Sequence, residues 1–428
     1  MPRRDLLLGL VPTRRNIFSR ADALRQKRRI EEQLRAWNVP FANIDWLNEE
    51  GLLYDAAAAP EVARRLREAG IGALLAPHCN FGSEDAVAQV ARLVGKPFLL
   101  WGPRDEAPLP DGMRLRDTQC GLFATSKVLR RLGVPFTYVI NSAVDSPVFR
   151  RGLHDFLGAA AAANAFLNAR IGQLDTRPAA FWTVMCNEGE LLERWGIQLV
   201  PTTLVDVERA VKALVERPTE QLTAAAEEIR TRVDLARVTE EELLRLAALK
   251  LALRAWAERE RLDAIAIQCW DALQNALGLF PCFVDGLLTD EFLPVACETD
   301  VHGALTALML QAAARYTTPI FFADLTVRHP EDDNAELLWH CGPFPLSLAE
   351  PESIPHITDN YIAATGVCGC GEWRIRDGDL TLARFDGDHG RYSLLMGHAR
   401  GTQGPFTRGT YLWAQVGNWP LWELKLVY

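Results

Sequence analysis

The first third of the chain alternates short apolar runs with amphipathic segments, and this alternation limits the fold more than any other feature. Runs such as residues 6–11 and 71–77 have the length and composition of buried strands, whereas residues 21–37 have helical periodicity. Strands and helices alternating at this spacing form crossover units around a mostly parallel sheet. The pattern predicts three more strands and three more helices: strands at 41–45, 98–101 and 136–140, and helices at 60–69, 83–94 and 117–132.

The middle of the chain repeats this alternation, and the end departs from it. Apolar runs predict strands at 169–174, 180–185, 197–201, 264–268 and 293–297. The charged stretch 216–261 is predicted to be helical, with a helix start at Thr239. Beyond residue 324 short alternating strands take over, and Asp377-Gly378 and Asp386-Gly387 are typical of hairpin turns. The sequence therefore predicts an α/β fold with two doubly wound parallel-sheet domains, 1–166 and 167–316, and a C-terminal β-rich domain, 317–428.

Composition narrows the classes of function. The net charge of -9 disfavours a nucleic-acid partner, which would need a basic face to replace counterions. No run approaches the roughly 18 apolar residues that span a bilayer, so no membrane partner is expected. The nine cysteines are an odd number and lie mostly in apolar stretches, as in proteins of a reducing compartment. We therefore expect a cytoplasmic protein.

Polar side chains follow three of the later apolar runs. Gln268 follows the run at 264–267, Glu298 follows 292–297, and Asp324 follows 319–323. Because ligands bind beyond the carboxyl ends of parallel strands, we expect these side chains to converge. His340 interrupts a further apolar stretch. Carboxylates with one imidazole suit Mn²⁺, with Mg²⁺ or Co²⁺ as alternatives, better than a thiolate-rich zinc site.

Several of these polar residues also have structural interpretations. Asp300 or Thr299 can cap the helix that follows them. His302, in the first turn of that helix, is expected to be a surface or capping residue. Cys368-Gly369-Cys370 lacks a second cysteine pair at zinc-type spacing, so a turn packed against the β-rich domain is favoured over a metal site.

Three motifs resemble the metal site of the L-fucose/L-arabinose isomerase family. Cys297-Glu298-Thr299-Asp300 resembles the stretch whose glutamate binds the metal and acts as acid/base. Phe322-Ala323-Asp324 resembles the strand end with the second metal-binding carboxylate, and Leu338-Trp339-His340 resembles the position of a histidine ligand. The resemblance implies catalytic Glu298 and Asp324, with Glu298, Asp324 and His340 holding the metal.

Two more motifs resemble sugar-binding segments of this family. Gln268-Cys269-Trp270 is similar to the segment whose glutamine contacts the sugar, and Asn80-Phe81-Gly82 resembles one beside a neighbouring subunit's active site. The resemblance implies a homo-oligomer, trimeric or hexameric, with active sites near subunit interfaces. It also implies aldose–ketose isomerisation of an open-chain sugar through an ene-diol, in which the metal stabilises charge developing on the sugar oxygens.

Two alternatives stay open. The sugar can be anionic, sulfonated or phosphorylated, with Arg14 and the adjacent Arg15 supplying a fork for the anion. Family members carry a further histidine beyond the segment that resembles residues 406–413, and none follows here before Tyr428. A shortened chain, a substitution by His398, or a catalytically impaired sugar-binding protein of the same fold would each account for that difference.

Overall fold

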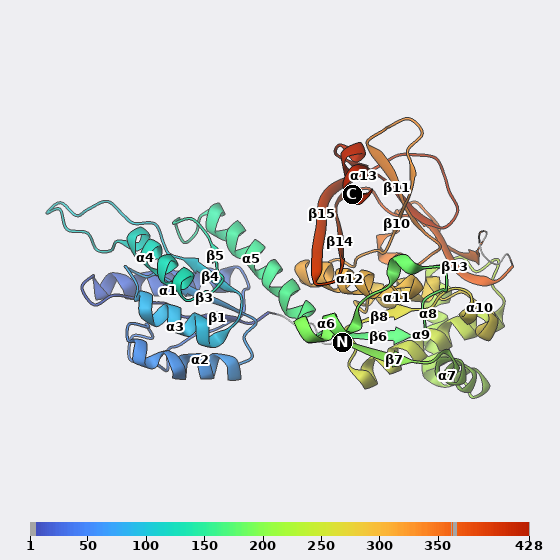
Figure 1. Cartoon of the computed structure of the whole chain (residues 1–428), viewed down its shortest axis with the longest axis horizontal. Helices are drawn as coiled ribbons and strands as arrows, with labels where there is room; N and C mark the ends of the chain where they lie inside the picture. The colour runs from blue at the N-terminus through green and yellow to red at the C-terminus, as the bar shows by residue number, and fades with distance from the viewer. Residues whose placement is uncertain (1–5, 361, 363–365, 428) are drawn as a thin grey trace. The chain divides into compact units, whose positions relative to one another are not determined.

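A computed structural model describes residues 6–360, 362 and 366–427. The chain divides into two compact units, Met1–Asn164 and Ala165–Tyr428 (Figure 1). The second unit contains both a parallel sheet and a β-rich sheet. The predicted α/β class with parallel sheets and a β-rich C-terminal part is confirmed. The predicted boundaries between three domains stay a prediction.

The first unit is a doubly wound parallel sheet with strand order β2-β1-β3-β4-β5. Alternate residues of each strand point to opposite faces, so Leu74 and Ala76 join one core and Ala73 and Leu75 the other. Helices α2, α3 and α4 cover the first face, and α1 and α5 cover the second. The bounds are β1 Leu8–Leu10, α1 Arg20–Ala36, β2 Phe41–Ala42, α2 Ala59–Glu68, β3 Ala73–Pro77, α3 Glu84–Val94, β4 Phe98–Trp101, α4 Thr118–Arg131, β5 Thr137–Tyr138 and α5 Pro147–Phe166.

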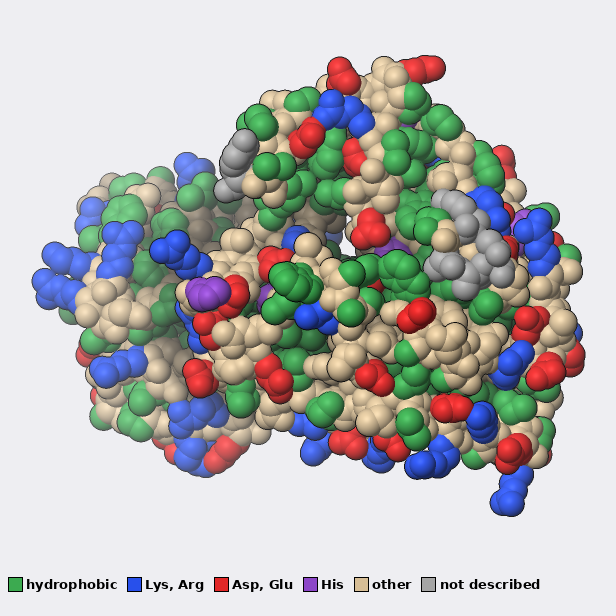
Figure 2. Space-filling model, turned by 45° about the vertical axis from the view of Figure 1, so that its right-hand side comes forward, with side chains coloured by type: hydrophobic (Ala, Val, Ile, Leu, Met, Phe, Trp, Pro, Cys, Tyr) green, Lys and Arg blue, Asp and Glu red, His purple; other side chains and the backbone are tan. Residues whose placement is uncertain are grey.

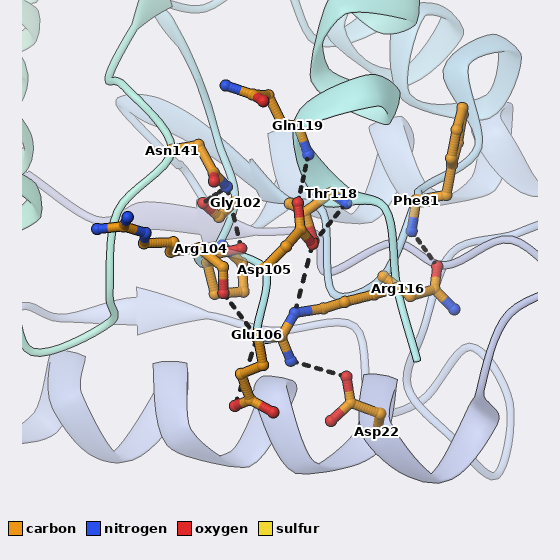
Figure 3. A network of polar contacts seen from close by, with 12 residues as sticks. Asp22, Phe81, Gly102, Arg104, Asp105, Glu106, Arg116, Thr118, Gln119 and Asn141 are labelled. Atoms are coloured by element: carbon orange, nitrogen blue, oxygen red, sulfur yellow. Dashed lines mark hydrogen bonds and ion pairs between the residues drawn. The ribbon is translucent and has the colours of Figure 1, made fainter. Parts of the chain in front are cut away.

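A buried arginine organises the loop that leads into α4 (Figure 3). Arg116 lies between Asp22 of α1 and Asp105, with its Nη1 2.8 Å from Asp22 Oδ2 and its Nε 3.6 Å from Asp105 Oδ1. Asp105 in turn accepts hydrogen bonds from the backbone N–H groups of Thr118 and Gln119, at 2.8 and 3.1 Å. Arg116 thus links the start of α4 to α1 through one ion-pair network.

Replacing Arg116 with Met is expected to destabilise the first unit by about 3 kcal/mol, the usual cost of breaking a buried ion pair. The side chains of Arg116 and Asp22 are only 3% and 2% exposed, so Asp22 would gain no water and would keep only the 44% exposed Arg25 as its ion-pair partner. The free energy of unfolding in urea measures the effect. Arg64→Met is the matched control, because Arg64 pairs with Glu61 and Glu68 on the surface of α2. Equal stability of the two variants would contradict the prediction.

The second unit begins with a four-stranded parallel sheet of order β7-β6-β8-β9. Ile265 and Ile267 of β8 pack with helices α7 to α11, whereas Ala264 and Ala266 pack with α12. Helix α9 starts at the predicted Thr239, which forms a reciprocal capping box with Glu242. The bounds are β6 Arg170–Leu174, α6 Glu188–Trp195, β7 Gln198–Thr202, α7 Leu204–Glu216, α8 Glu220–Arg232, α9 Glu240–Glu260, β8 Ala264–Ile267, α10 Ala272–Leu277, α11 Cys282–Asp290, β9 Val295–Ala296 and α12 Val301–Ala313.

The β-rich sheet has seven strands, of which β10-β11-β16-β13-β12 form a continuous path, while β15 joins β14 to β16. All its pairs are antiparallel except β13 with β16. One face of β11 and β16 buries Leu338, Ala414 and Val416, and the opposite face buries Leu337, Tyr411 and Trp413. The bounds are β10 Asp324–Arg328, β11 Ala335–His340, β12 His356–Asp359, β13 Cys368–Arg374, β14 Asp379–Asp388, β15 Arg391–Thr402, β16 Thr410–Val416 and α13 Trp419–Val427.

Two predicted strands are wrong. Residues 180–185 form a 3-10 turn, Trp182–Val184, whose Trp182 is 73% exposed, because both neighbouring positions beside β6 are taken by β7 and β8. Residues 319–323 form no strand, although Phe321 and Phe322 are partly buried against the cores of the second unit. This apolar run is a partly buried connection without a strand partner.

The predicted hairpin signals are also displaced. Asp377-Gly378 joins β13 to β14, which do not pair with each other, and Asp386-Gly387 lies inside β14. The turn between β14 and β15 is formed instead by His389 and Gly390, both with positive φ, closed by the pair Asp388 and Arg391. Two positive φ values in a two-residue loop match the right-handed twist of the flanking strands.

The visible surface is a mosaic in which acidic, basic and hydrophobic side chains alternate (Figure 2). Within the described part of the chain, no helix has the length and apolar character that crossing a bilayer requires.

Candidate active site

Glu298 occupies an unusual backbone position at the carboxyl edge of the second parallel sheet. Strand β9 ends at Ala296, and the short turn Cys297–Thr299 follows it. Glu298 and Thr299 both have positive φ, 56° and 59°, which non-glycine residues adopt rarely and at some energetic cost. Such residues cluster at functional sites, where the surrounding structure holds them in place.

The thiol of Cys269 contacts both the backbone and the side chain of Glu298. The backbone N–H of Glu298 points to Cys269 Sγ at 3.4 Å, and that sulfur lies 3.6 Å from Glu298 Oε1. Cys269 follows β8, which pairs with β9 in parallel through Ala266 and Ala296. The parallel register thus brings the two strand ends together, as the sequence predicted for Gln268 and Glu298.

His340 comes to the same edge from the last position of β11. It is buried, at 2% exposure, and its Nδ1 accepts a hydrogen bond of 3.0 Å from the backbone N–H of Cys341. Its Nε2 lies 3.7 Å from Glu298 Oε2 and is buried with no hydrogen-bond partner. Burial opposes protonation of His340, but the negative charges facing it outweigh burial and raise its pKa above the usual range.

Asp324 begins β10, where it lies opposite Trp339, the neighbour of His340 on β11. The prediction that it ends a parallel strand is therefore wrong. Partial removal of water from around its carboxyl raises the pKa of Asp324 above the usual range. The positive charge of His340 opposes this rise, and the negative charge of Glu298 adds to it. Because Asp324 is exposed on its strand, water limits the rise.

Gln268 and Trp270 flank Cys269. Gln268 is 8% exposed, and its buried Oε1 has no hydrogen-bond partner. Trp270 is 40% exposed and meets Phe181 edge-on, with 5.3 Å between the ring centroids. The amide therefore has an oxygen left for a ligand, and the indole offers an open apolar face.

The two other predicted sugar-binding residues belong to the first unit. Arg14 is 8% exposed and donates to Glu50 from Nε and Nη2, at 2.5 and 3.1 Å. Asn80 is fully buried, and its Oδ1 accepts a 2.8 Å hydrogen bond from the backbone N–H of Arg15. Their roles towards a sugar stay predictions.

The structural interpretation of Asp300 is confirmed, and that of His302 is wrong. Asp300 caps α12 by accepting a 2.8 Å hydrogen bond from the backbone N–H of Gly303. His302 is 1% exposed rather than on the surface, because β14 covers it and its Nδ1 lies 3.1 Å from Asp386 Oδ1. Cys368 and Cys370 lie on strand β13 rather than in a turn. Histidine His398 is exposed on β15.

Sequence reasoning missed three groups beside Glu298. The thiols of Cys269 and Cys297 lie with a Glu298 carboxylate oxygen inside a 4.8 Å span. Asp285 of α11 is fully buried, its Oδ2 lies 3.9 Å from Cys297 Sγ, and burial raises its pKa well above the usual range. A signal for Asp285 was present, because it is a lone carboxyl between apolar neighbours, Phe283-Val284 before it and Leu287-Leu288 after it.

A carboxylate, an imidazole and an amide at the carboxyl edge of a parallel sheet define an acid–base site of an α/β enzyme. Residues 9–167 match the model of the fucose/sulfoquinovose isomerase N-terminal domain. A sulfoquinovose isomerase of Priestia aryabhattai is 26% identical over 340 residues, 79% of this chain and 74% of the relative. One of Alkalicoccus urumqiensis is 25% identical over 394 residues, 90% of this chain and 83% of the relative. The chain thus matches the fucose/sulfoquinovose isomerase N-terminal domain over residues 9–167 and is similar to sulfoquinovose isomerases over most of its length.

Solved structures are much less similar. An ABC transporter solute-binding protein from Bacillus halodurans C-125 with bound myo-inositol has 12% identity, covers 74% of this chain and 91% of its own, and has a TM-score of 0.18. A score this low carries no structural argument.

Proposed function

We propose that this aldose–ketose isomerase acts on an anionic hexose, with a sulfonated sugar such as sulfoquinovose as the leading substrate. The observation that carries the proposal is the pair of Glu298 and His340, whose facing Oε2 and Nε2 atoms are 3.7 Å apart at the carboxyl edge of β8 and β9. The relatives that are sulfoquinovose isomerases favour the anionic sugar over a neutral deoxyhexose or pentose.

Glu298 and His340 are placed to share a divalent cation, but Asp324 does not complete a group of three with them. Among the described residues, the one group of three ligand atoms within 4.8 Å is Cys269, Cys297 and Glu298, so Asp324 would have to move inward to bind the same ion. His340 Nε2 is buried without a hydrogen-bond partner and faces a carboxylate oxygen, as a metal-facing imidazole would. The negative charge of Glu298 contributes to the raised pKa of Asp324, and a shared cation would remove that cost. Glu298, Asp324 and His340 would hold Mn²⁺, or Mg²⁺ or Co²⁺ in its place. When bound, the ion supplies electrostatic stabilisation of negative charge on the sugar oxygens.

The two carboxyl groups move the proton between the adjacent carbons. Isomerisation takes a proton from C2 of the open-chain aldose and adds one to C1, while the hydroxyl proton of O2 is transferred to O1. Glu298 takes the C2 proton as its carboxylate, Asp324 gives a proton to C1 as its acid, and proton exchange with water then restores both groups. Gln268 orients the sugar through its free Oε1, and Trp270 covers an apolar face of it.

An arginine of the first unit is the proposed anion contact. The charge of Arg14 is already paired with the buried Glu50, whereas the Arg15 side chain is 32% exposed and its ion pair is a 3.3 Å contact with the 36% exposed Glu84. Arg15 also donates from Nε to the Gly82 carbonyl at 3.1 Å and lies over the Phe81 ring. The implied trimer or hexamer would bring this segment, with Asn80, to a neighbouring subunit's site. We also assign the enzyme to the cytoplasm, and its nine free cysteines favour that compartment.

The test compares sulfoquinovose with glucose, its neutral counterpart, in the presence of Mn²⁺. We expect ketose formation from the sulfonated sugar, at least 10-fold weaker conversion of glucose, and abolition by a chelator. Arg15→Ala should raise KM for the sulfonated sugar by about 10-fold, the worth of a charge-assisted hydrogen bond, and leave KM for glucose unchanged. Arg14→Ala is run in parallel.

The outcomes separate the alternatives. Equal loss with both sugars in the two arginine variants would exclude an anion contact by this segment. A sugar that raises the melting temperature while no ketose forms with added Mn²⁺ would exclude the isomerase and leave a sugar-binding protein of the same fold.

A further inference from the structure

Five of the nine cysteines gather beside the proposed active site. Cys282 is the hub of this group: its Sγ lies 3.1 Å from that of Cys341, and its side chain also contacts those of Cys297 and Cys370. Cys269 contacts Cys297 on the other side. All but Cys341 are buried, and all nine cysteines are free thiols. Packing alone does not require so many thiols in one place, because any small apolar side chain fills such space.

Two of these thiols and Glu298 have the geometry of a metal site. Cys269 Sγ, Cys297 Sγ and a Glu298 carboxylate oxygen all lie within 4.8 Å of one another, the one such group of three found among the residues that the structure describes. Ligand atoms at about 2.0 to 2.3 Å from a tetrahedral ion are about 3.5 Å apart, so a small inward shift would suffice. The donors come from two adjacent strand ends, which fixes their spacing.

Helix α11 aims a further donor at this group. Cys282 and Asp285 are one turn apart on α11, and both reach Cys297, Asp285 through Oδ2 at 3.9 Å from Cys297 Sγ. The other oxygen, Asp285 Oδ1, is fully buried and has no hydrogen-bond partner. An unpartnered buried carboxyl oxygen is costly, and a cation beside it would remove that cost.

We propose that Cys269, Cys297 and Glu298 form a binding site for a thiophilic divalent cation, Zn²⁺ or Co²⁺, with Cys282 or Asp285 as the fourth donor. Thiolates select these ions over Mn²⁺ and Mg²⁺, which prefer oxygen ligands. As the two sulfur–metal bonds form, each thiol loses its proton to solvent, so at least two protons are released for each ion bound.

This site shares Glu298 with the proposed isomerase site. A thiophilic ion bound there would engage the carboxylate that is assigned to take the sugar's C2 proton. Zn²⁺ would therefore inhibit where Mn²⁺ activates. The binding itself needs no sugar and no turnover, so it stands or falls separately from the proposed isomerase activity.

Titration of the metal-free, full-length chain with Co²⁺ alone tests the proposal. Bound Co²⁺ should give a near-ultraviolet sulfur-to-cobalt charge-transfer band, which Zn²⁺ removes and a similar concentration of Mn²⁺ does not. Cys269→Ser and Cys297→Ser should each weaken Co²⁺ binding at least 10-fold. The controls are Cys120→Ser, at an exposed thiol, and Cys368→Ser, at a buried thiol outside the group, and both should bind as the unmodified chain does.

The proposal would be overturned if the wild-type chain with Co²⁺ showed no charge-transfer band. It would also be overturned if the band were unchanged in both Cys269→Ser and Cys297→Ser. If either variant fails to fold, X-ray absorption of the Zn²⁺-loaded wild-type chain decides. A sulfur shell at about 2.3 Å supports the site, and a shell of oxygen and nitrogen alone refutes it. An intact band in a chain that does not isomerise sugars would refute the isomerase and leave the thiol site standing.

Discussion

Replacing Glu298 with Gln is expected to lower kcat for ketose formation by about 10³-fold, the usual contribution of a general acid or base. Gln keeps the size and hydrogen-bonding capacity of the side chain but cannot take a proton. The side chain of Glu298 is 17% exposed, so a substrate can reach it, and His340 faces it at 3.7 Å. Initial rates with sulfoquinovose and saturating Mn²⁺ measure the loss.

Circular dichroism must show that the Glu298→Gln variant is folded, since Glu298 and Thr299 occupy a strained turn. Glu193→Gln, at an exposed carboxylate on α6, is the matched control and should retain the full rate. A folded Glu298→Gln variant with more than a tenth of the wild-type kcat would remove Glu298 from the chemistry.

The parallel sheets could be predicted because their strands are short apolar runs that alternate with helical segments. Runs such as 264–268 are continuous apolar segments between helices, and β8 forms there with alternate residues in two cores. Gln268 and Glu298 could then be placed at one edge, because the carboxyl ends of parallel strands lie at the same edge of the sheet. Asp324 is an exception, because the apolar run 319–323 before it is only partly buried and pairs with no strand, which composition does not reveal.

The thiol group could not be predicted from spacing. Its members are Cys269, Cys282, Cys297, Cys341 and Cys370, which come from four strand ends or strands and one helix and share no CxxC motif. A cysteine in an apolar run is indistinguishable from any small buried hydrophobe until its neighbours in space are known. Likewise, the left-handed backbone of Glu298 is set by tertiary contacts, among them the one from its N–H to Cys269 Sγ.

Replacing Asp324 with Asn is expected to lower kcat for ketose formation by about 10³-fold, as for Glu298→Gln. Removal of the C2 proton by Glu298 should remain intact. In the metal-free chain burial and the negative charge of Glu298 raise the pKa of Asp324, whereas a bound cation would lower it again. Initial rates with sulfoquinovose and saturating Mn²⁺ measure the loss in Asp324→Asn, and Glu193→Gln serves again as the control.

Deuterium exchange separates the two carboxyl groups. In D₂O the wild-type product should carry deuterium at C1, because the proton that Asp324 delivers comes from solvent and not from C2. Asp324→Asn should still exchange the C2 hydrogen of the aldose, whereas Glu298→Gln should not, because only Glu298 removes it. If exchange is lost in Asp324→Asn and kept in Glu298→Gln, the two roles are reversed. If wild-type ketose forms without deuterium, the proton added to C1 does not come from solvent, and the scheme with two separate carboxyl groups is wrong.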